Sequence, residues 1–87
     1  MKNLYLYLGI NHNEFPYPVL FKKIGEEKYS KKDILDIGIR ISKDIEKVTY
    51  VAGFDEKGKM VIAHDFQDGE HCGELDIDHL KYIVLGK

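Results

Sequence analysis

Residues that could bind a metal ion or transfer a proton crowd into one short segment, from His64 to His79. Its sequence is HDFQDGEHCGELDIDH, in which three histidines, one cysteine, four aspartates and two glutamates make up ten of sixteen residues. Side chains of these types ligate metals, act as acids and bases, or present negative charge to a basic partner. The segment therefore admits a metal site, a catalytic site, an acidic docking surface, or a solvated loop between two strands.

A zinc site could use His64, His71, Cys72 and His79, which carry the nitrogen and sulfur ligands that zinc prefers. Their spacings of seven, one and seven lack the short paired steps, such as C-x-x-C, that are typical of zinc modules. Adjacent residues 71 and 72 would also point to opposite sides of a strand. A calcium loop aligned on Gly73 fails because His79 stands where the bidentate glutamate belongs. The pattern disfavours a metal site, and we expect no cofactor.

Catalysis is disfavoured for similar reasons. A nucleophilic cysteine at position 72 must ionise near neutral pH beside a base, and nothing in the sequence indicates such a base. A carboxylate pair of the glycosidase kind needs a substrate cleft, which 87 residues rarely provide together with a core. No glycine-rich run precedes a predicted helix, so no phosphate-binding loop is expected. We therefore expect a protein that is not an enzyme.

Negative charge is the clearest property of the segment. Residues 65–78 carry six carboxylates and no lysine or arginine, in a chain whose net charge is only −2. Such a block attracts a positive surface over about one Debye length, roughly 8–10 Å. We predict a docking surface for a basic protein partner, made of these carboxylates and an aromatic anchor near each end: Asp65, Phe66, Asp68, Glu70, Glu74, Asp76, Asp78 and Tyr82. A mobile, solvated loop is the alternative that the sequence leaves open.

The function predicted from this pattern is that of a small binding or regulatory protein. An inhibitor of a nucleic-acid enzyme, of the kind that phages and mobile elements encode, is its most concrete form, since a nucleic-acid enzyme has a basic face. The alternative is a small metal-binding or nucleic-acid-binding domain. Lysines interleaved with aromatic residues can bind single strands, and the set here is Lys22, Lys23, Lys28, Lys31 and Lys32 with Phe15, Tyr17, Phe21 and Tyr29. Glu26 and Glu27 inside this set disfavour nucleic acid.

The length and composition predict one domain, residues 1–87. The single cysteine excludes an intramolecular disulfide. No apolar run is long enough for a membrane span, and the first fifteen residues lack the features of a signal peptide. These observations predict a cytoplasmic protein without a membrane partner, and they leave the oligomeric state open. The composition, rich in lysine and isoleucine, suits a bacterial or phage origin.

The elements that position the segment are predicted from periodicity. The stretch KNLYLYLG alternates Leu4, Leu6 and Leu8 with two tyrosines, which predicts a strand covered on both faces. VLFKKIG is ambiguous between a strand and a helical turn. Isoleucines three and four residues apart predict a helix over 31–46, with Ser30 and Asp33 as its capping box. Gly38 falls on the apolar side of this helix, where it permits close approach to a sheet.

Two apolar runs around the turn DEKG predict a hairpin over residues 48–66. Tyr50, Ala52 and Phe54, with Val48, are expected to share one face of its first strand. Met60, Ile62, His64 and Phe66 are expected to share one face of the second strand, where His64 is a hydrogen-bonded core or edge residue. A strand or turn at 75–77 and a final strand near 80–85 complete the order. The fold class is therefore α+β: a small, mostly antiparallel sheet of about four to five strands with one helix packed on one face.

Overall fold

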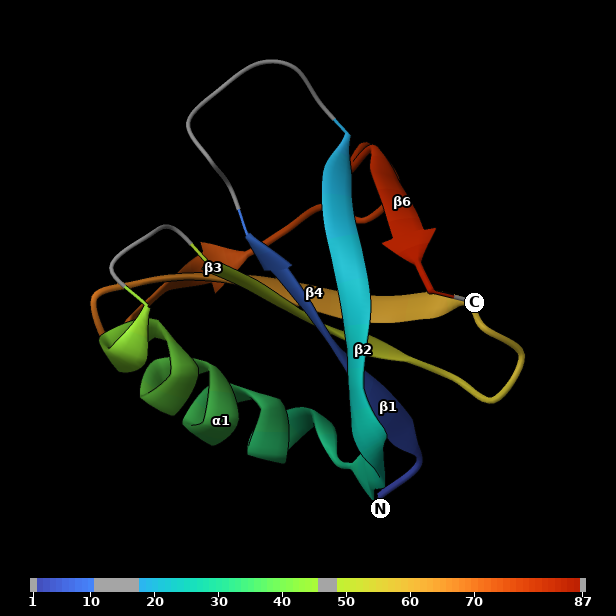
Figure 1. The fold of residues 1–87 in the computed structure, drawn as a ribbon, viewed down its shortest axis with the longest axis horizontal. Coiled ribbons are helices and arrows are strands. Elements are labelled where there is room, and N and C mark those ends of the chain that lie inside the picture. Colours follow the sequence, from blue (N-terminus) through green and yellow to red (C-terminus); the bar gives the residue numbers. More distant parts are fainter. Residues whose placement is uncertain (1, 11–17, 46–48, 87) are drawn as a thin grey trace.

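The computed structural model describes residues 2–10, 18–45 and 49–86. Phe15, Tyr17 and Val48, which the sequence analysis names, lie outside these residues. In the described part the chain forms six strands and one helix (Figure 1): β1 (Leu4–Ile10), β2 (Val19–Tyr29), α1 (Lys31–Asp44), β3 (Thr49–Phe54), β4 (Met60–Gln67), β5 (Glu70–Glu74) and β6 (Tyr82–Leu85).

The strands form one sheet in the order β5-β4-β3-β1-β2-β6. Four neighbouring pairs are antiparallel, and the pair of β2 with β6 is parallel. The predicted α+β fold, with one helix on a mostly antiparallel sheet, is confirmed. The described residues contain six strands rather than four to five, because 19–29 is extended throughout and 70–74 folds back as β5 inside the predicted acidic segment.

The start of α1 carries the predicted capping box. The Ser30 Oγ accepts a hydrogen bond from the Asp33 N–H at 3.2 Å, and the Asp33 carboxylate accepts one from the Ser30 N–H at 3.2 Å. The same backbone hydrogen bond from Ser30 lowers the pKa of Asp33. At the other end the helix stops at Asp44, short of residue 46, because Ile45 already has an extended backbone.

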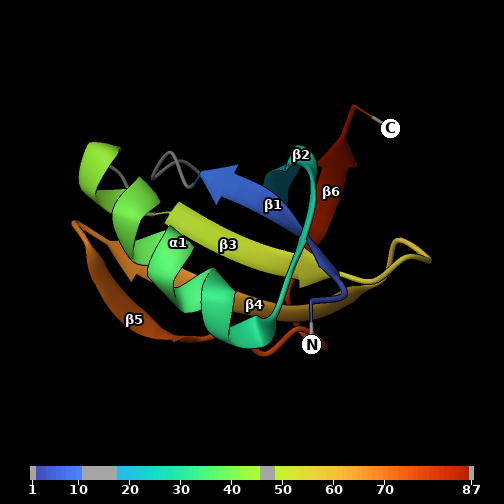
Figure 2. The same cartoon turned by 90° about the horizontal axis from the view of Figure 1, so that it is seen from below.

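The first core lies between α1 and the sheet. The helix runs along β3, β4 and β5 and leaves the β6 end of the sheet uncovered (Figure 2). Gly38 permits the close approach that the sequence predicts, since a Cβ at this position would lie 2.3 Å from carbons of the Phe66 ring. The residues buried in this core are Leu4, Leu6, Ile34, Val51 and Phe66.

The second core lies on the opposite face of the sheet. Its buried residues are Tyr7, Val19, Phe21, Ala52, Phe54, Met60 and Ala63. The alternation along β1 explains why both faces are apolar, as predicted: Leu4 and Leu6 face the helix, whereas Tyr5 and Tyr7 belong to the second core.

Residues 75–81 cover this second core. They leave β5 at one edge of the sheet and reach β6 at the other edge. On the way Leu75, Ile77 and Leu80 pack against the second core, and in β6 Tyr82 and Val84 do the same. The chain therefore uses its last part as a strap across the face that α1 does not cover.

The predicted hairpin of β3 and β4 is present, and Gly58 has a φ of +81° in its turn. Tyr50, Ala52 and Phe54 share the face of the second core, as predicted. The prediction that Met60 shares a face with Phe66 is wrong. The register shifts between Gly53 and Phe54, and this irregularity turns Met60 toward the second core while Phe66 faces α1.

Candidate functional site

The acidic segment is an ordered hairpin rather than a loop. Strands β4 and β5 pair antiparallel, and two residues, Asp68 and Gly69, connect them with φ values of +50° and +85°. Positive φ at both positions belongs to a type I′ turn, which matches the twist of paired strands and favours the sequence Asp-Gly. The solvated-loop interpretation of 65–78 is therefore wrong for residues 65–74.

The tip of this hairpin is attached to the end of α1. The Ser42 Oγ accepts a hydrogen bond from the Gly69 N–H at 2.8 Å and donates one to the Ile39 carbonyl oxygen at 3.1 Å. Ser42 is fully buried, and these two hydrogen bonds satisfy both the donor and the acceptor of its hydroxyl group. The alkyl part of Lys43 also lies against Gly69. These contacts hold the turn in place relative to the helix.

Five carboxylates project from the hairpin and the segment after it, and together they form what we call the acidic edge. All five residues are exposed: Asp68, Glu70, Glu74, Asp76 and Asp78. Among the described residues, no ion pair joins a lysine or arginine to any of them. The lysines of the first half of the chain therefore do not neutralise the acidic edge, and its negative charge faces solvent.

Asp76 differs from the other four because it stabilises a turn. Its Oδ2 lies 2.7 Å from the Nδ1 of His79, and its Oδ1 accepts a hydrogen bond from the Asp78 N–H at 3.1 Å. The hydrogen bond with His79, followed by that with Asp78, lowers the pKa of Asp76. This carboxylate consequently has an internal partner that a docking protein would have to compete with.

Two histidines meet behind the acidic edge, on the side of the sheet that faces α1. The Nδ1 of His64 lies 3.0 Å from the Nε2 of His71, and the His71 ring packs against Phe66 with centroids 5.3 Å apart. His64 is only 5% exposed, which agrees with the prediction of a hydrogen-bonded core or edge histidine. Its pKa is lowered first by burial and then by the charge of His71, and Glu74 opposes both effects.

Asp65 is the one carboxylate of residues 65–78 that is not part of the acidic edge. It lies half-buried in β4 opposite Gly73, and its Oδ1 is buried without a hydrogen-bond partner among the described residues. Burial raises the pKa of this carboxyl group, although His71 and a backbone hydrogen bond from Phe66 act in the opposite direction. Of the six carboxylates in 65–78, this one is poorly placed to meet a partner.

The two predicted aromatic anchors are also placed differently from the expectation. Phe66 is completely buried under α1, and Tyr82 packs its ring against Phe21 and Phe54 at centroid distances of 6.0 and 5.9 Å. Both residues are therefore part of a core, and the prediction that they anchor a partner beside the carboxylates is corrected. The acidic edge is a polar surface without an exposed aromatic anchor from this pair.

The remaining chemical candidates do not come together. Cys72 is exposed, and its Sγ approaches the Glu70 carbonyl oxygen at 3.8 Å. His79 is engaged with Asp76, away from the pair of His64 and His71. Within residues 2–10, 18–45 and 49–86, no three histidine, cysteine, aspartate or glutamate side chains converge as a metal-binding group.

The lysine set around the helix start is partly neutralised. Lys23 pairs with Glu26 at 2.9 Å while its ammonium lies 4.2 Å from the centroid of the Tyr5 ring. Lys28 pairs with Glu56 at 2.6 Å. Two of the five lysines proposed for nucleic-acid binding thus have acidic partners within the chain. These partners weaken the positive electrostatic potential that the five lysines could present to a nucleic acid.

An apolar surface at the opposite end of the sheet was missed by the sequence reasoning. Leu20, Ile83 and Leu85 are 45%, 47% and 43% exposed, and these are large hydrophobic side chains left open to solvent. Pairing of β2 with β6 places Leu20 beside Ile83 and Lys22 beside Leu85. We call the three apolar side chains the β6 strip. No local signal reveals it, because the exposure depends on how far α1 reaches across the sheet.

Comparison with family models, curated proteins and solved structures finds no match to this chain. Among the described residues, no helix has the length and apolar character needed to cross a membrane. Inferences about function therefore have to be drawn from the two surfaces described above.

Proposed function

We propose that this chain is a small, non-catalytic binding protein that docks through its acidic edge onto a basic surface of a protein partner. The observation that carries the proposal is the absence of any lysine or arginine ion pair to Asp68, Glu70, Glu74, Asp76 or Asp78 among the described residues. Uncompensated like charges repel one another in the free protein, and an opposite charge on a partner relieves this repulsion.

The rigidity of the hairpin supports docking rather than solvation alone. The type I′ turn and the hydrogen bond from the Gly69 N–H to Ser42 hold the backbone that carries Asp68 and Glu70. Charges that are already ordered lose little conformational entropy on binding, so more of the electrostatic attraction contributes to affinity. The basic nucleic-acid-binding face of an enzyme is one surface that such an arrangement suits.

The position of Phe66 and Tyr82 inside the cores changes the expected character of the interaction. Without these aromatic anchors, charge supplies most of the attraction, and binding should depend strongly on salt. The Debye length falls from about 10 Å in about 0.1 M salt to about 3 Å in about 1 M salt. We therefore expect fast, salt-sensitive association.

The experiment compares two variants that change the net charge equally. The first neutralises the acidic edge by Asp68→Asn, Glu70→Gln, Glu74→Gln and Asp78→Asn. Asp76 is kept because it holds the turn at residues 76–79. Asparagine is suitable at position 68, where φ is +50°, because it adopts this left-handed conformation readily.

The matched control neutralises four exposed carboxylates elsewhere, through Glu26→Gln, Glu27→Gln, Asp36→Asn and Asp44→Asn. Each immobilised protein is used to capture partners from a lysate of its source cells, and the captured protein is then purified and titrated in low and high salt. We expect the first variant to lose binding and the control to keep it. Equal binding by both variants would refute the assignment of the surface.

A further inference from the structure

The two edges of the sheet are protected very differently. Edge strand β5 carries Glu70 and Glu74, and its register with β4 shifts near Cys72. Charges and irregularities of this kind prevent an edge from pairing with another chain. Edge strand β6 has the sequence YIVL, with no charge, no proline and no register shift against β2. Of the two edges, β6 is therefore the one that the described residues leave open to a further strand.

The hydrogen-bonding groups of this open edge can be identified from the ladder. The Val19 N–H donates to the Lys81 carbonyl oxygen at 3.0 Å, and Val19 pairs with Tyr82 in the register. In a parallel ladder of this register, residues 81, 83 and 85 bond to β2, so the N–H and C=O groups of Tyr82 and Val84 point away from it. These two residues offer two donors and two acceptors at the last position of the sheet.

The side chains beside this edge form the β6 strip, on the same face of the sheet as α1 but at the end that α1 does not reach. Tyr82 and Val84 pack into the second core, whereas Ile83 and Leu85 point to the other face and are about half exposed. Leu20 lies next to Ile83 in the register. Figure 1 shows α1 and β6 at opposite ends of the sheet, which explains why the helix does not shield these side chains.

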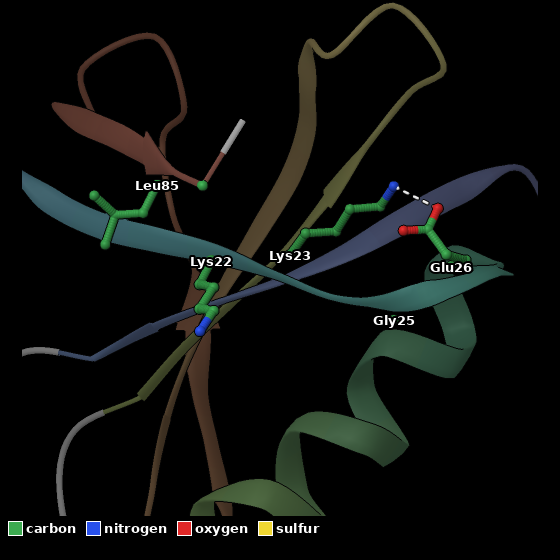
Figure 3. A pocket seen from close by; sticks show the side chains of 6 residues that line it. Lys22, Lys23, Gly25, Glu26 and Leu85 are labelled. Carbon is green, nitrogen blue, oxygen red and sulfur yellow. Dashed lines mark hydrogen bonds and ion pairs between the residues drawn. The ribbon is translucent and has the colours of Figure 1, made fainter.

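Positive charge surrounds the β6 strip. Lys22 pairs with Leu85 in the register and is exposed, and exposed Lys81 immediately precedes β6. Where β6 ends, a recess of about 230 Å³ is lined by Lys22, Lys23, Gly25, Glu26, Leu85 and Gly86. Figure 3 shows that Lys23 turns toward Glu26, so that Lys22 is the cation of this recess without an ion pair among the described residues.

We propose that the β6 edge is a second docking site, which binds an extended segment of a protein partner whose side chains on one face are apolar in the middle and acidic at the ends. Its main chain would pair with Tyr82 and Val84, its apolar side chains would cover the β6 strip, and its carboxylates would meet Lys22 and Lys81. Addition of a strand to an open sheet edge is a recurrent mode of peptide recognition.

The size of the surface favours a single strand over a second folded copy. Three half-exposed side chains make a narrow strip, far below the roughly 800 Å² per partner that a stable interface between folded proteins needs. A second copy that paired symmetrically through its own β6 would also present lysines, and not carboxylates, to Lys22 and Lys81. A lipid surface fits poorly, because it would leave the four polar main-chain groups of Tyr82 and Val84 without hydrogen-bond partners.

The test uses the synthetic peptide Glu-Thr-Val-Thr-Val-Thr-Glu, which places two valines and the two terminal glutamates on the same face of a strand, as Ile83, Leu85, Lys22 and Lys81 are on theirs. Two control peptides have lysines in place of the glutamates, or N-methyl groups on the amides of one edge. Binding is followed by NMR titration of the isotope-labelled protein and by hydrogen exchange. We expect shifts confined to β6 and its neighbours in β2, slower exchange of the Tyr82 and Val84 amides, and about tenfold weaker binding of both control peptides.

Variants of the protein distinguish binding at the β6 edge from unspecific attraction between charged groups. Ile83→Ser and, independently, Leu20→Ser remove an apolar contact without changing the charge and should each weaken binding of the peptide by about tenfold, while Glu70→Lys at the other edge should leave its affinity unchanged. The exposure of Ile83 and Leu20 makes both variants compatible with folding, which the dispersion of their NMR spectra checks. Three results would overturn the proposal. The N-methylated peptide could bind as tightly as the original peptide, the protein could dimerise through β6 without peptide, or it could bind phosphatidylserine vesicles instead of the peptide.

Discussion

Replacing Gly38 by alanine tests whether α1 lies directly on the Phe66 ring. The new Cβ would lie 2.3 Å from two ring carbons, whereas ordinary contacts begin at 3.4 Å, so helix and sheet would have to separate by the difference. Overpacking of a buried site costs about 1–3 kcal/mol, and alanine returns about 1 kcal/mol of helix propensity. Because Phe66 is completely buried and cannot swing into solvent, we expect a net loss of about 2 kcal/mol.

Urea and thermal unfolding followed by circular dichroism measure this loss. A destabilisation of about 2 kcal/mol lowers the Tm by about 10 °C in a domain of this size. Asp36→Ala, at an exposed position of the same helix, is the control and should change stability little. Adding Phe66→Leu to Gly38→Ala should recover part of the loss, which a double-mutant cycle reports. A Gly38→Ala protein as stable as the original would refute the close approach.

Three further predictions concern the hairpin. Ser42→Ala removes the acceptor of the Gly69 N–H and should cost about 1–2 kcal/mol, with faster hydrogen exchange of that amide; unchanged exchange would contradict the attachment. Because burial lowers the pKa of His64, the unfolded chain takes up a proton first as the pH falls below the usual value of 6.5. The free energy of unfolding should therefore decrease below that pH, and His64→Gln should flatten this dependence in pH-dependent denaturation. Burial raises the pKa of Asp65, so the ionised carboxylate destabilises the folded protein at pH 7 and Asp65→Asn should increase the free energy of unfolding there. This gain should disappear below pH 3.8, the usual carboxyl pKa, where both states of the original protein are protonated. Equal unfolding curves of the two proteins at pH 7 would show that the ionised Asp65 does not destabilise the fold.

Local features of the fold were predictable because they depend on neighbouring residues. The capping box at Ser30 follows from side chains three residues apart, and the two apolar faces of β1 follow from strict alternation. The β4–β5 turn could also have been predicted. Asp68 and Gly69 form a standard hairpin dipeptide, but the segment was interpreted only as a charged docking surface or a solvated loop.

Features that depend on distant parts of the chain could not be predicted in the same way. Whether Phe66 and Tyr82 are exposed depends on contacts with residues far away in the sequence: α1 covers Phe66, and Tyr82 packs against Phe21 and Phe54. The β6 strip likewise follows from the parallel pairing of β6 with β2, more than fifty residues earlier in the chain. Met60 was misplaced because a register shift in the hairpin leaves no mark on the alternation.

The strap of residues 75–81 also decides what a partly folded chain would expose. The buried residues of the first core come from β1, α1, β3 and β4 alone. Phe21, Phe54 and Val19 of the second core are covered by side chains of the strap and of β6. If this last part of the described chain detached, one apolar face of the sheet would be open to water, and surfaces of this kind make partly folded proteins aggregate.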